Sequence, residues 1–174
     1  MNTTKQLVEQ LEKLTNKKVL LKEYRNEEGE PISIEESIEW FKFNGWEDLQ
    51  SFFDNKTNEA PGYSDDWEEV AEHVENIKKA FKPLSRDMIV FRSANSDQYK
   101  KGFTSTTLSL DVAKSFGSTN DVIGIYLKKG QLAADLTYFE NVNDIDEEEI
   151  LLPNIKKYNF VEEKDNIKYY TVDL

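Results

Sequence analysis

The stretch "DIDEEEILLP", residues 144–153, decides how the second half of this chain is interpreted. Five of its first six residues carry a carboxylate, and an apolar run follows directly. A block of like charges is usually a solvated segment, because the charges repel one another. Here the block leads into residues that suit a buried strand. We therefore expect the carboxylates at the edge of a folded core, where they can have a role in binding or catalysis.

The spacing of the last three glutamates gives one possible role. If residues 147–153 form a strand, alternate side chains share a face, so Glu147 and Glu149 lie about 7 Å apart on one side. Two carboxylates placed in this way form an anionic wall that can stabilise a cation. The alternative is an acidic loop that leads into an edge strand, where charge prevents pairing with other chains. The stretch alone leaves both interpretations open.

Length and charge restrict the class of protein. The chain has 174 residues, enough for one domain with a proper core, and a formal net charge of −12. This charge disfavours nucleic acid and anionic membranes as partners. No apolar run is long enough to span a membrane, and the first residues lack an apolar signal segment. These features leave the compartment open.

Several kinds of chemistry are excluded by composition. The chain has no cysteine and one histidine, His73, which we expect on a helix surface or half-buried. Thiolate catalysis, disulfides and zinc sites are therefore excluded. Asp144, Asp146 and Glu148 alternate faintly as in a calcium loop, but the necessary glycine is missing, so no metal is expected. Any catalysis must come from carboxylates and an arginine.

Helical patterns fill the first half of the chain. Three helix starts are expected at capping residues: Thr3, Ser33 and Ser64. Ser33 has Glu36 three positions later, which is the spacing of a capping box. Asn44 and Gly45 are expected to interrupt the helix that follows.

Strand-like patterns fill the second half. The expected elements are strands over 88–92, 102–107, 121–130, 131–137 and 147–153, a short helix over 110–116, and a terminal hairpin that turns at 164–166. This order predicts an α+β fold, with N-terminal helices followed by a mixed or antiparallel two-sheet β core. We expect a single domain over 1–174, mainly helical in 1–85 and mainly β in 86–174.

Two further motifs accompany the glutamates. Arg92 ends the apolar run "MIVF", and a charge at the end of a core strand lies either at a site or at the surface. Ser105, Thr106 and Thr107 follow a glycine and an aromatic residue in "GFTSTT". Singly, each motif has a plain explanation, because serine and threonine favour strands and helix caps, and Arg92 is then a surface cation.

In this order, the three motifs resemble those of the arginine–serine–glutamate clade of mono-ADP-ribosyltransferases. That pattern is an arginine at a strand end, an aromatic–x–Ser–Thr–Ser/Thr strand, and Glu–x–Glu before Ile-Leu-Leu-Pro. The clade includes binary-toxin enzyme components, C3-like exoenzymes and bacteriophage enzymes. The resemblance runs from about residue 33 to the end of the chain and implies the ADP-ribosyltransferase fold.

The resemblance implies cleavage of the nicotinamide–ribose bond of NAD and transfer of ADP-ribose to a protein arginine. Glu149 would stabilise the positive charge that develops on the ribose. Glu147 would orient the acceptor and help to deprotonate it, because a free guanidinium has a pKa above 12. Arg92 would hold the NAD phosphates or ribose by charge-assisted hydrogen bonds, and Ser105 would orient Glu149.

The resemblance also assigns binding residues. Further NAD contacts are implied for Ser93, Gly102, Phe103, Thr106, Thr107 and Phe116. Tyr138 and Phe139, in the segment 136–146, would contact the target protein together with Glu147. NAD is the only cofactor implied, as a substrate and without a metal. The partner would be a protein with an accessible arginine, and we expect a monomer that binds neither nucleic acid nor membranes. The resemblance implies a protein of the bacterial or phage-infected cytoplasm, or a toxin delivered by a separate chain.

One departure and two alternatives accompany this interpretation. Thr119 stands near where the clade often has an arginine, so NAD binding is weaker or is supported by Lys100, Lys101 or Lys114. The first alternative is an NAD glycohydrolase of the same fold. The second is a non-enzymatic acidic protein that binds a basic partner, which predicts no NAD binding and strongly salt-dependent association.

Overall fold

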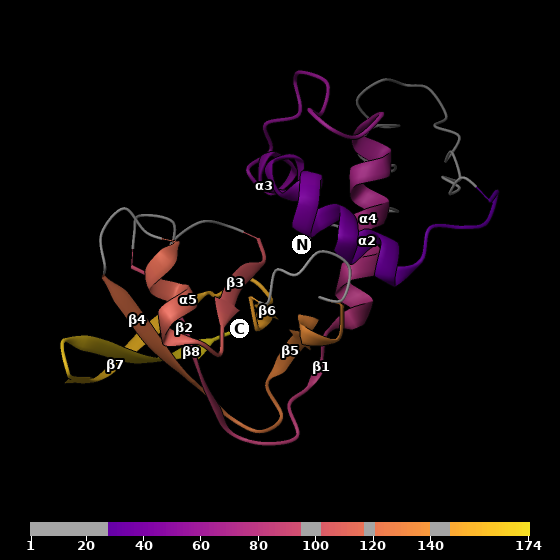
Figure 1. Ribbon diagram of the computed structural model, residues 1–174. Coiled ribbons are helices and arrows are strands. Elements are labelled where there is room, and N and C mark those ends of the chain that lie inside the picture. Colours follow the sequence, from indigo (N-terminus) through magenta and orange to yellow (C-terminus); the bar gives the residue numbers. More distant parts are fainter. Residues whose placement is uncertain (1–27, 95–101, 117–120, 140–146) are drawn as a thin grey trace. The chain divides into compact units, whose positions relative to one another are not determined.

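The computed structural model describes residues 28–94, 102–116, 121–139 and 147–174. The chain forms two compact units, Met1–Lys79 and Ala80–Leu174. The described helices before residue 80 precede a mixed sheet, as Figure 1 shows, so the predicted α+β order is confirmed. The predicted helix start at Thr3 lies outside the described residues. Within these ranges, no helix combines the length and apolar character that crossing a membrane requires.

The helical unit begins with a capped helix. Its described elements are α2 (Ile34–Trp40), the π-helix η1 (Phe41–Gly45), α3 (Trp46–Phe53) and α4 (Trp67–Ala80). At the start of α2, the Glu36 backbone N–H donates to Ser33 Oγ at 3.1 Å, and the Ser33 N–H donates to Glu36 Oε2 at 2.6 Å. The predicted capping box is therefore confirmed, with two backbone donors satisfied reciprocally.

The prediction that Asn44 and Gly45 interrupt the helix is wrong. The chain passes through both residues as a π-helical turn and continues directly into α3. Gly45 lies against the ring of Trp40, and a Cβ at this position would stand 2.1 Å from Trp40 Cε2. The glycine is therefore needed for a close approach of the ring, and the helix is not broken by it.

The cap of α4 also differs from the prediction. Asp66 Oδ1, and not the Ser64 hydroxyl, accepts the backbone N–H of Glu69 at 3.0 Å. Ser64 Oγ instead accepts a hydrogen bond from Trp40 Nε1 at 3.1 Å. The aromatic donor therefore occupies the hydroxyl that a local sequence pattern would assign to the helix end.

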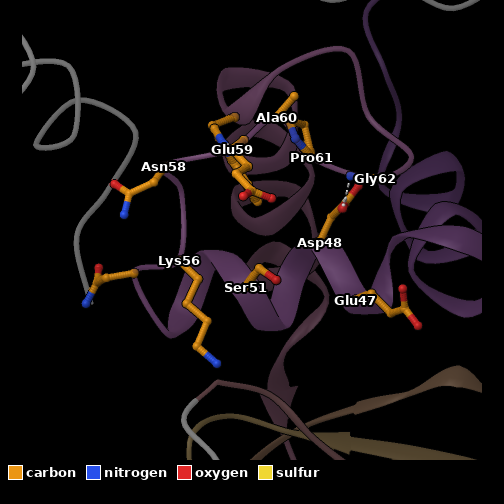
Figure 2. A pocket seen from close by; sticks show the side chains of 11 residues that line it. Glu47, Asp48, Ser51, Lys56, Asn58, Glu59, Ala60, Pro61 and Gly62 are labelled. Atoms are coloured by element: carbon orange, nitrogen blue, oxygen red, sulfur yellow. Dashed lines mark hydrogen bonds between the residues drawn. The ribbon is translucent and has the colours of Figure 1, made fainter.

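A buried carboxylate fixes the loop before α4. Asp48, on α3, accepts the backbone N–H groups of Gly62, Tyr63 and Ser64 at 2.6, 2.9 and 3.1 Å. Figure 2 shows this carboxylate beside an open hollow lined by α3 and the loop. Three charge-assisted bonds account for the burial of Asp48, so its role is to hold the loop.

The second unit contains the sheet. Its elements are β1 (Lys82–Pro83), β2 (Met88–Ser93), β3 (Thr104–Thr107), α5 (Leu110–Ser115), β4 (Val122–Leu127), β5 (Leu132–Asp135), the 3-10 helix η3 (Leu136–Phe139), β6 (Glu149–Leu152), β7 (Lys157–Lys164) and β8 (Ile167–Asp173). The described strands are ordered β1-β5-β6-β3-β2-β4-β8-β7. Strands β4 and β8 are parallel and the other neighbours antiparallel, so the sheet is mixed, as predicted.

The two expected sheets occur as two groups within one sheet. The groups β1-β5-β6-β3 and β2-β4-β8-β7 meet between β2 and β3, where a single pair, Phe91 and Thr107, is in register. Strand twist accumulates across a sheet, and one pair of residues is a narrow junction that limits the pairing between the groups. The sequence pattern shows the strands but contains no sign of this junction.

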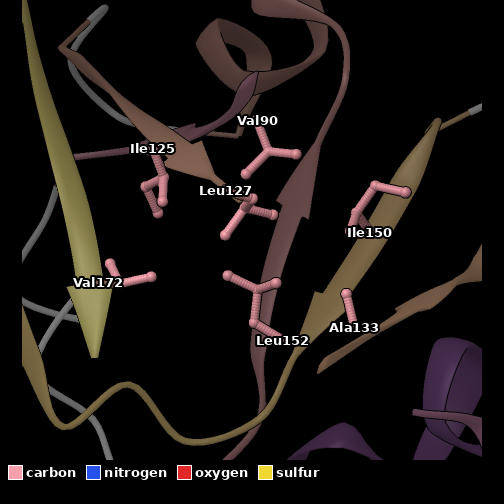
Figure 3. Close-up of a cluster of buried hydrophobic side chains, with 7 residues drawn as sticks. All are labelled: Val90, Ile125, Leu127, Ala133, Ile150, Leu152 and Val172. Carbon is pink, nitrogen blue, oxygen red and sulfur yellow. The ribbon is translucent and has the colours of Figure 1, made fainter. Parts of the chain in front are cut away.

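Both groups contribute to one hydrophobic core. Figure 3 shows its buried side chains, which are Val90, Ile125, Leu127, Ala133, Ile150, Leu152 and Val172. They come from β2, β4 and β8 on one side of the junction and from β5 and β6 on the other. Burying a side chain of this size stabilises the fold by about 1.5–3 kcal/mol, so the shared core holds the two groups together.

The terminal hairpin forms as predicted. Lys164 pairs with Ile167, and the two residues between them, Asp165 and Asn166, have φ values of +53° and +62°. A two-residue hairpin turn with positive φ at both positions matches the natural twist of the flanking strands. Aspartate and asparagine tolerate this conformation better than most residues, which is why the turn could be predicted.

Candidate active site

The central contact of the site joins β3 and β6. Thr107 is in register with Glu149, and Ser105 with Leu151, so Ser105 and Glu149 are diagonal neighbours on one face. Ser105 Oγ donates to Glu149 Oε1 at 2.8 Å. Glu149 is the first residue of β6 and only 5% exposed, whereas Ser105 is exposed. A hydroxyl at the surface is therefore bonded to a nearly buried carboxylate, which is the contact that the family resemblance implies.

The glutamates before Glu149 do not continue its strand. Glu148 has a left-handed φ of +44°, so β6 begins at Glu149, and the prediction of a strand over 147–153 is wrong at its first two residues. Thr107 Oγ1 donates to the Glu147 carbonyl at 2.7 Å, and the Leu108 N–H donates to the Glu148 carbonyl at 3.0 Å. These two bonds hold the backbone of Glu147 and Glu148 in a bent conformation, so the side chains do not alternate as they would in a strand. A left-handed residue other than glycine costs about 1–3 kcal/mol and is typical of functional sites.

The two threonines tie the strands of the site together. Thr106 and Thr107 are buried, and the Thr106 hydroxyl donates to the Ile150 carbonyl. Thr107 Oγ1 also accepts the backbone N–H of Ser109, the residue that caps α5. The side chains of this pair therefore support β6 and α5 in addition to the β3–β6 backbone ladder.

Arg92 lies near the end of β2 and on its core side. Strand alternation puts it on the face of Val90, opposite the face of Phe91. Its Nη1 donates to the Tyr158 hydroxyl at 3.3 Å, and it makes no ion pair with a described residue. Within the described ranges, two buried side-chain polar atoms have no hydrogen-bond partner: Arg92 Nε and Ser93 Oγ. An unsatisfied buried polar group costs about 1–3 kcal/mol, so this pair is unlike the rest of the interior.

The three sequence motifs therefore lie on three adjacent strands, in the order β6-β3-β2. Ser105 and Glu149 are in contact. Arg92 is one strand beyond β3, and the residue of β2 that is in register with Thr107 is its neighbour Phe91. The guanidinium is held by Tyr158, a residue of β7 that belongs to none of the three sequence motifs. The 66 positions between Arg92 and Tyr158 leave no local signal for this contact.

Other predicted NAD contacts surround the start of β3 and the end of α5. Gly102 is buried with a φ of +100°, and its N–H donates to Asn154 Oδ1 at 3.3 Å. The Phe103 ring meets the edge of Phe81 with centroids 5.2 Å apart. Phe116, which ends α5, is 63% exposed. Gly102 and Phe103 thus anchor the strand that carries Ser105, and Phe116 is available at the surface.

Some of the predicted site residues, or their side chains, are not among those that the structure describes. Tyr138 and Phe139 end η3, but their side chains are not among those described. The acidic residues Asp144 and Asp146, and the possible cation substitutes at 100 and 101, also lie outside the described ranges, as does Thr119. Lys114 is described and is exposed on α5.

The single histidine is more buried than predicted. His73 is 4% exposed and stacks on Trp40, with ring centroids 4.2 Å apart. Its Nδ1 lies 2.9 Å from Ser37 Oγ. Burial lowers the pKa of His73 to about 4, although Glu36 acts to raise it. The expectation of a surface or half-buried residue is wrong because His73 lies on the helix face that packs inward. In the described ranges, no three His, Asp or Glu residues gather into a group that could hold a metal.

Comparison with solved structures defines the class of the fold. An ADP-ribosyltransferase of the C3 type from Clostridium botulinum is 15% identical over 80% of this chain and 84% of its own, with a TM-score of 0.53. An ADP-ribosyltransferase toxin from Paenibacillus larvae is 14% identical over 98% and 95%, with a TM-score of 0.54. Exoenzyme S from Pseudomonas aeruginosa, solved with human 14-3-3 protein beta and Carba-NAD, is 13% identical over 80% and 72%, with a TM-score of 0.53. The chain has the fold of the C3-like ADP-ribosyltransferase toxins.

A sequence match is consistent with this class. The family of ADP-ribosyltransferase exoenzymes matches residues 93–174, which begin at the last residue of β2 and include β3, β6 and the hairpin. This match and the shared fold agree with the resemblance that the motifs carry, and the match includes the serine and glutamate motifs but not Arg92. No curated protein matches the sequence. The bacteriophage branch of the resemblance stays a prediction.

Proposed function

We propose that this protein is an NAD-dependent mono-ADP-ribosyltransferase that modifies arginine on a target protein and releases nicotinamide. The observation that carries the proposal is the 2.8 Å hydrogen bond from Ser105 Oγ to Glu149 Oε1. The match of residues 93–174 to the ADP-ribosyltransferase exoenzyme family supports the reaction class, and the fold shared with an enzyme solved with Carba-NAD supports the substrate.

The proposed first step breaks the bond between the nicotinamide nitrogen and C1′ of the ribose. The nicotinamide leaves with the bonding electrons, and positive charge develops on the ribose. Glu149 stabilises that charge through the ribose hydroxyls, in a nearly buried position where electrostatic effects are stronger than in water. Ser105 fixes the orientation of the carboxylate before the substrate binds, so less reorganisation is needed during the reaction.

Glu147 is proposed to act on the acceptor. An arginine guanidinium must lose a proton as its nitrogen attacks C1′, and this group is a poor nucleophile while it is protonated. A carboxylate two residues before Glu149 supplies both a partner for the incoming cation and a base for its proton. The Thr107 bond to the Glu147 carbonyl and the left-handed Glu148 hold the backbone that carries this side chain.

Arg92 is proposed to bind the NAD phosphates. Its Nε is buried without a described partner, and the adjacent Ser93 Oγ shares this property. A phosphate oxygen of NAD is a suitable acceptor for the Arg92 donor, and charge-assisted bonds of this kind are strong. The remaining proposed NAD contacts are Gly102, Phe103, Thr106, Thr107 and Phe116. Tyr138 and Phe139 are proposed to contact the target protein together with Glu147.

The proposal is tested with labelled NAD and an arginine-rich acceptor protein. The wild type should release nicotinamide and label arginine. Glu149→Gln should lose both activities, because it keeps an acceptor for Ser105 but removes the charge. Glu147→Gln should lose labelling and keep some nicotinamide release. Glu148→Gln removes one carboxylate from the same turn and is the matched control, which should retain both activities.

Each of the other outcomes would support a different function for this protein. Nicotinamide release without labelled protein would favour an NAD glycohydrolase, and labelling of another residue type would contradict the arginine assignment. A wild type that binds no NAD but associates with a basic protein in a salt-dependent way would favour the acidic binding protein. Peptide mass spectrometry of a treated bacterial or host lysate would identify the target, which we propose to be a protein of the cell in which this chain acts.

We further propose that the two compact units work as one domain over residues 1–174, and that the protein is a monomer. Size-exclusion chromatography with light scattering checks the monomer. A truncated chain that begins at residue 80 checks the domain, because it should lose transferase activity if both units are needed. Full activity of the truncated chain would contradict the single-domain proposal.

A further inference from the structure

We propose that Tyr158 is a positioning residue for Arg92, holding the guanidinium in its binding geometry without neutralising its charge. The inference rests on the proposed function, because it assigns a role in NAD binding to a residue that no sequence motif includes. It starts from one contact: Arg92 Nη1 donates to the Tyr158 hydroxyl at 3.3 Å.

The contact bridges distant strands. In the sheet order β2-β4-β8-β7, Arg92 and Tyr158 are three strand positions apart, which is about 14 Å in a flat sheet. Two long side chains that lean towards each other over one face of the sheet bridge this separation. Tyr158 packs against the core cluster that includes Val90, the neighbour of Arg92 on the same face of β2. The guanidinium thus lies where the core ends and polar groups begin.

Tyr158 is itself well fixed. It pairs with Val172 on β8, and its ring meets the ring of Tyr170 edge-on, with centroids 5.8 Å apart and an interplanar angle of 86°. Edge-to-face aromatic pairs add about 0.5–1.5 kcal/mol beyond area burial. A hydroxyl on such a ring is a more rigid acceptor than one on a flexible side chain, so it can restrict the rotamers of the arginine.

The hydrogen-bond partner of Arg92 is neutral, which leaves the arginine able to bind an anion. The chain has 34 acidic residues, yet Arg92 makes no ion pair with a described residue and is held by a neutral hydroxyl. A carboxylate in this place would cancel the charge and compete with an anionic ligand. The phenol oxygen accepts a hydrogen bond from one of the five N–H groups of the guanidinium and does not neutralise its positive charge. The buried Nε without a described partner then has a suitable acceptor in a phosphate oxygen of NAD.

The test is Tyr158→Phe, which removes the hydroxyl and keeps the ring. We expect the Kd and KM for NAD to rise by about tenfold, as for one hydrogen bond to a charged group, with kcat changed less than about twofold. Tyr126→Phe is the matched control, because it removes a tyrosine hydroxyl that is bonded at 2.7 Å to Glu162 of β7 and not to Arg92. Kd is measured by titration of NAD in the Glu149→Gln background, where turnover is expected to be absent.

A double-mutant cycle separates positioning from general structure. If Tyr158 acts through Arg92, Tyr158→Phe should have little further effect on Kd in an Arg92→Lys background, because the two changes remove the same interaction. Equal NAD binding by Tyr158→Phe and wild type, or full additivity with Arg92→Lys, would overturn the role of Tyr158 and leave the proposed function standing. A wild type that binds no NAD would overturn both proposals.

Discussion

Each unit of the molecule contains buried polar side chains, and the two sets differ in how their hydrogen bonds are satisfied. In the helical unit, Ser37 Oγ lies within 3.1 Å of both His73 Nδ1 and Asn76 Nδ2, and none of the described atoms there is buried without a partner. In the sheet unit, Arg92 Nε and Ser93 Oγ are buried and have no described partner.

The difference separates a structural cluster from a candidate binding site. Nearly all buried polar groups in native proteins are satisfied, because an unpaired group loses its hydration without compensation. The Ser37 cluster follows this rule, and its hydrogen bonds account for the burial of its polar atoms without a ligand. The Arg92–Ser93 pair breaks the rule at the strand end where the sequence motif also places the NAD cation.

The largest effect is expected on acid stability of the helical unit. His73 has a pKa of about 4 in the folded state, below its ordinary value of 6.5, so the unfolded state binds more protons between these values. The contribution of neutral His73 is therefore complete above pH 6.5 and is lost as pH falls towards 4, by up to about 3 kcal/mol. Urea unfolding of wild type and His73→Gln at about pH 7, above that range, and at about pH 4.5, near its lower end, measures most of this loss. Equal pH dependence in the two proteins would contradict this account.

A smaller effect is expected from Ser37→Ala. This change leaves both His73 Nδ1 and Asn76 Nδ2 without the shared hydroxyl, and Ser37 is fully buried. We expect a loss of about 2 kcal/mol in the free energy of unfolding. Denaturant titration checks the value, and a loss below about 0.5 kcal/mol would show that the cluster is not the structural support inferred here.

Ser105→Ala should reduce turnover and leave stability nearly unchanged. It removes the donor that orients Glu149 without removing the carboxylate, so we expect kcat to fall about tenfold. Ser115→Ala, an exposed change on α5, is the control and should have the activity of wild type. Unchanged kcat in Ser105→Ala would mean that Glu149 is held by its other contacts.

No loss of stability is expected from Ser93→Ala. The substitution is the same as Ser37→Ala, but the hydroxyl is buried without a described partner, so its removal should leave the free energy of unfolding unchanged or raise it by up to about 1–3 kcal/mol. NAD binding should weaken. A clear loss of stability in Ser93→Ala, measured by denaturant titration, would remove the contrast between Ser37 and Ser93.

The sequence was a good guide where local chemistry sets the structure. The Ser33–Glu36 capping box formed because both partners lie within one turn, and the hairpin turned at Asp165 and Asn166 because these residues accept positive φ. The strand with Ser105 and the one with Glu149 were placed beside each other only by the family resemblance. No local pattern predicts which strands become neighbours.

Long-range packing explains the predictions that were wrong. Gly45 was expected to break a helix, but the ring of Trp40 fills the space of its missing side chain. Glu147 was expected on a strand, but bonds from β3 hold a turn at Glu148. Tyr158 was not singled out, because its partner is three strands away in the sheet order. Each outcome depends on residues brought together by the folded chain.

The most direct test of the central claim compares Glu149→Gln with Glu148→Gln in the rate of ADP-ribose transfer from NAD to an arginine acceptor. Both changes remove one negative charge from adjacent positions, and only Glu149 receives the Ser105 hydrogen bond at the start of β6. We expect the rate to fall by about 10³-fold for Glu149→Gln and less than about threefold for Glu148→Gln, with both proteins folded. Equal rates in the two variants would contradict the assignment of Glu149 as the catalytic carboxylate.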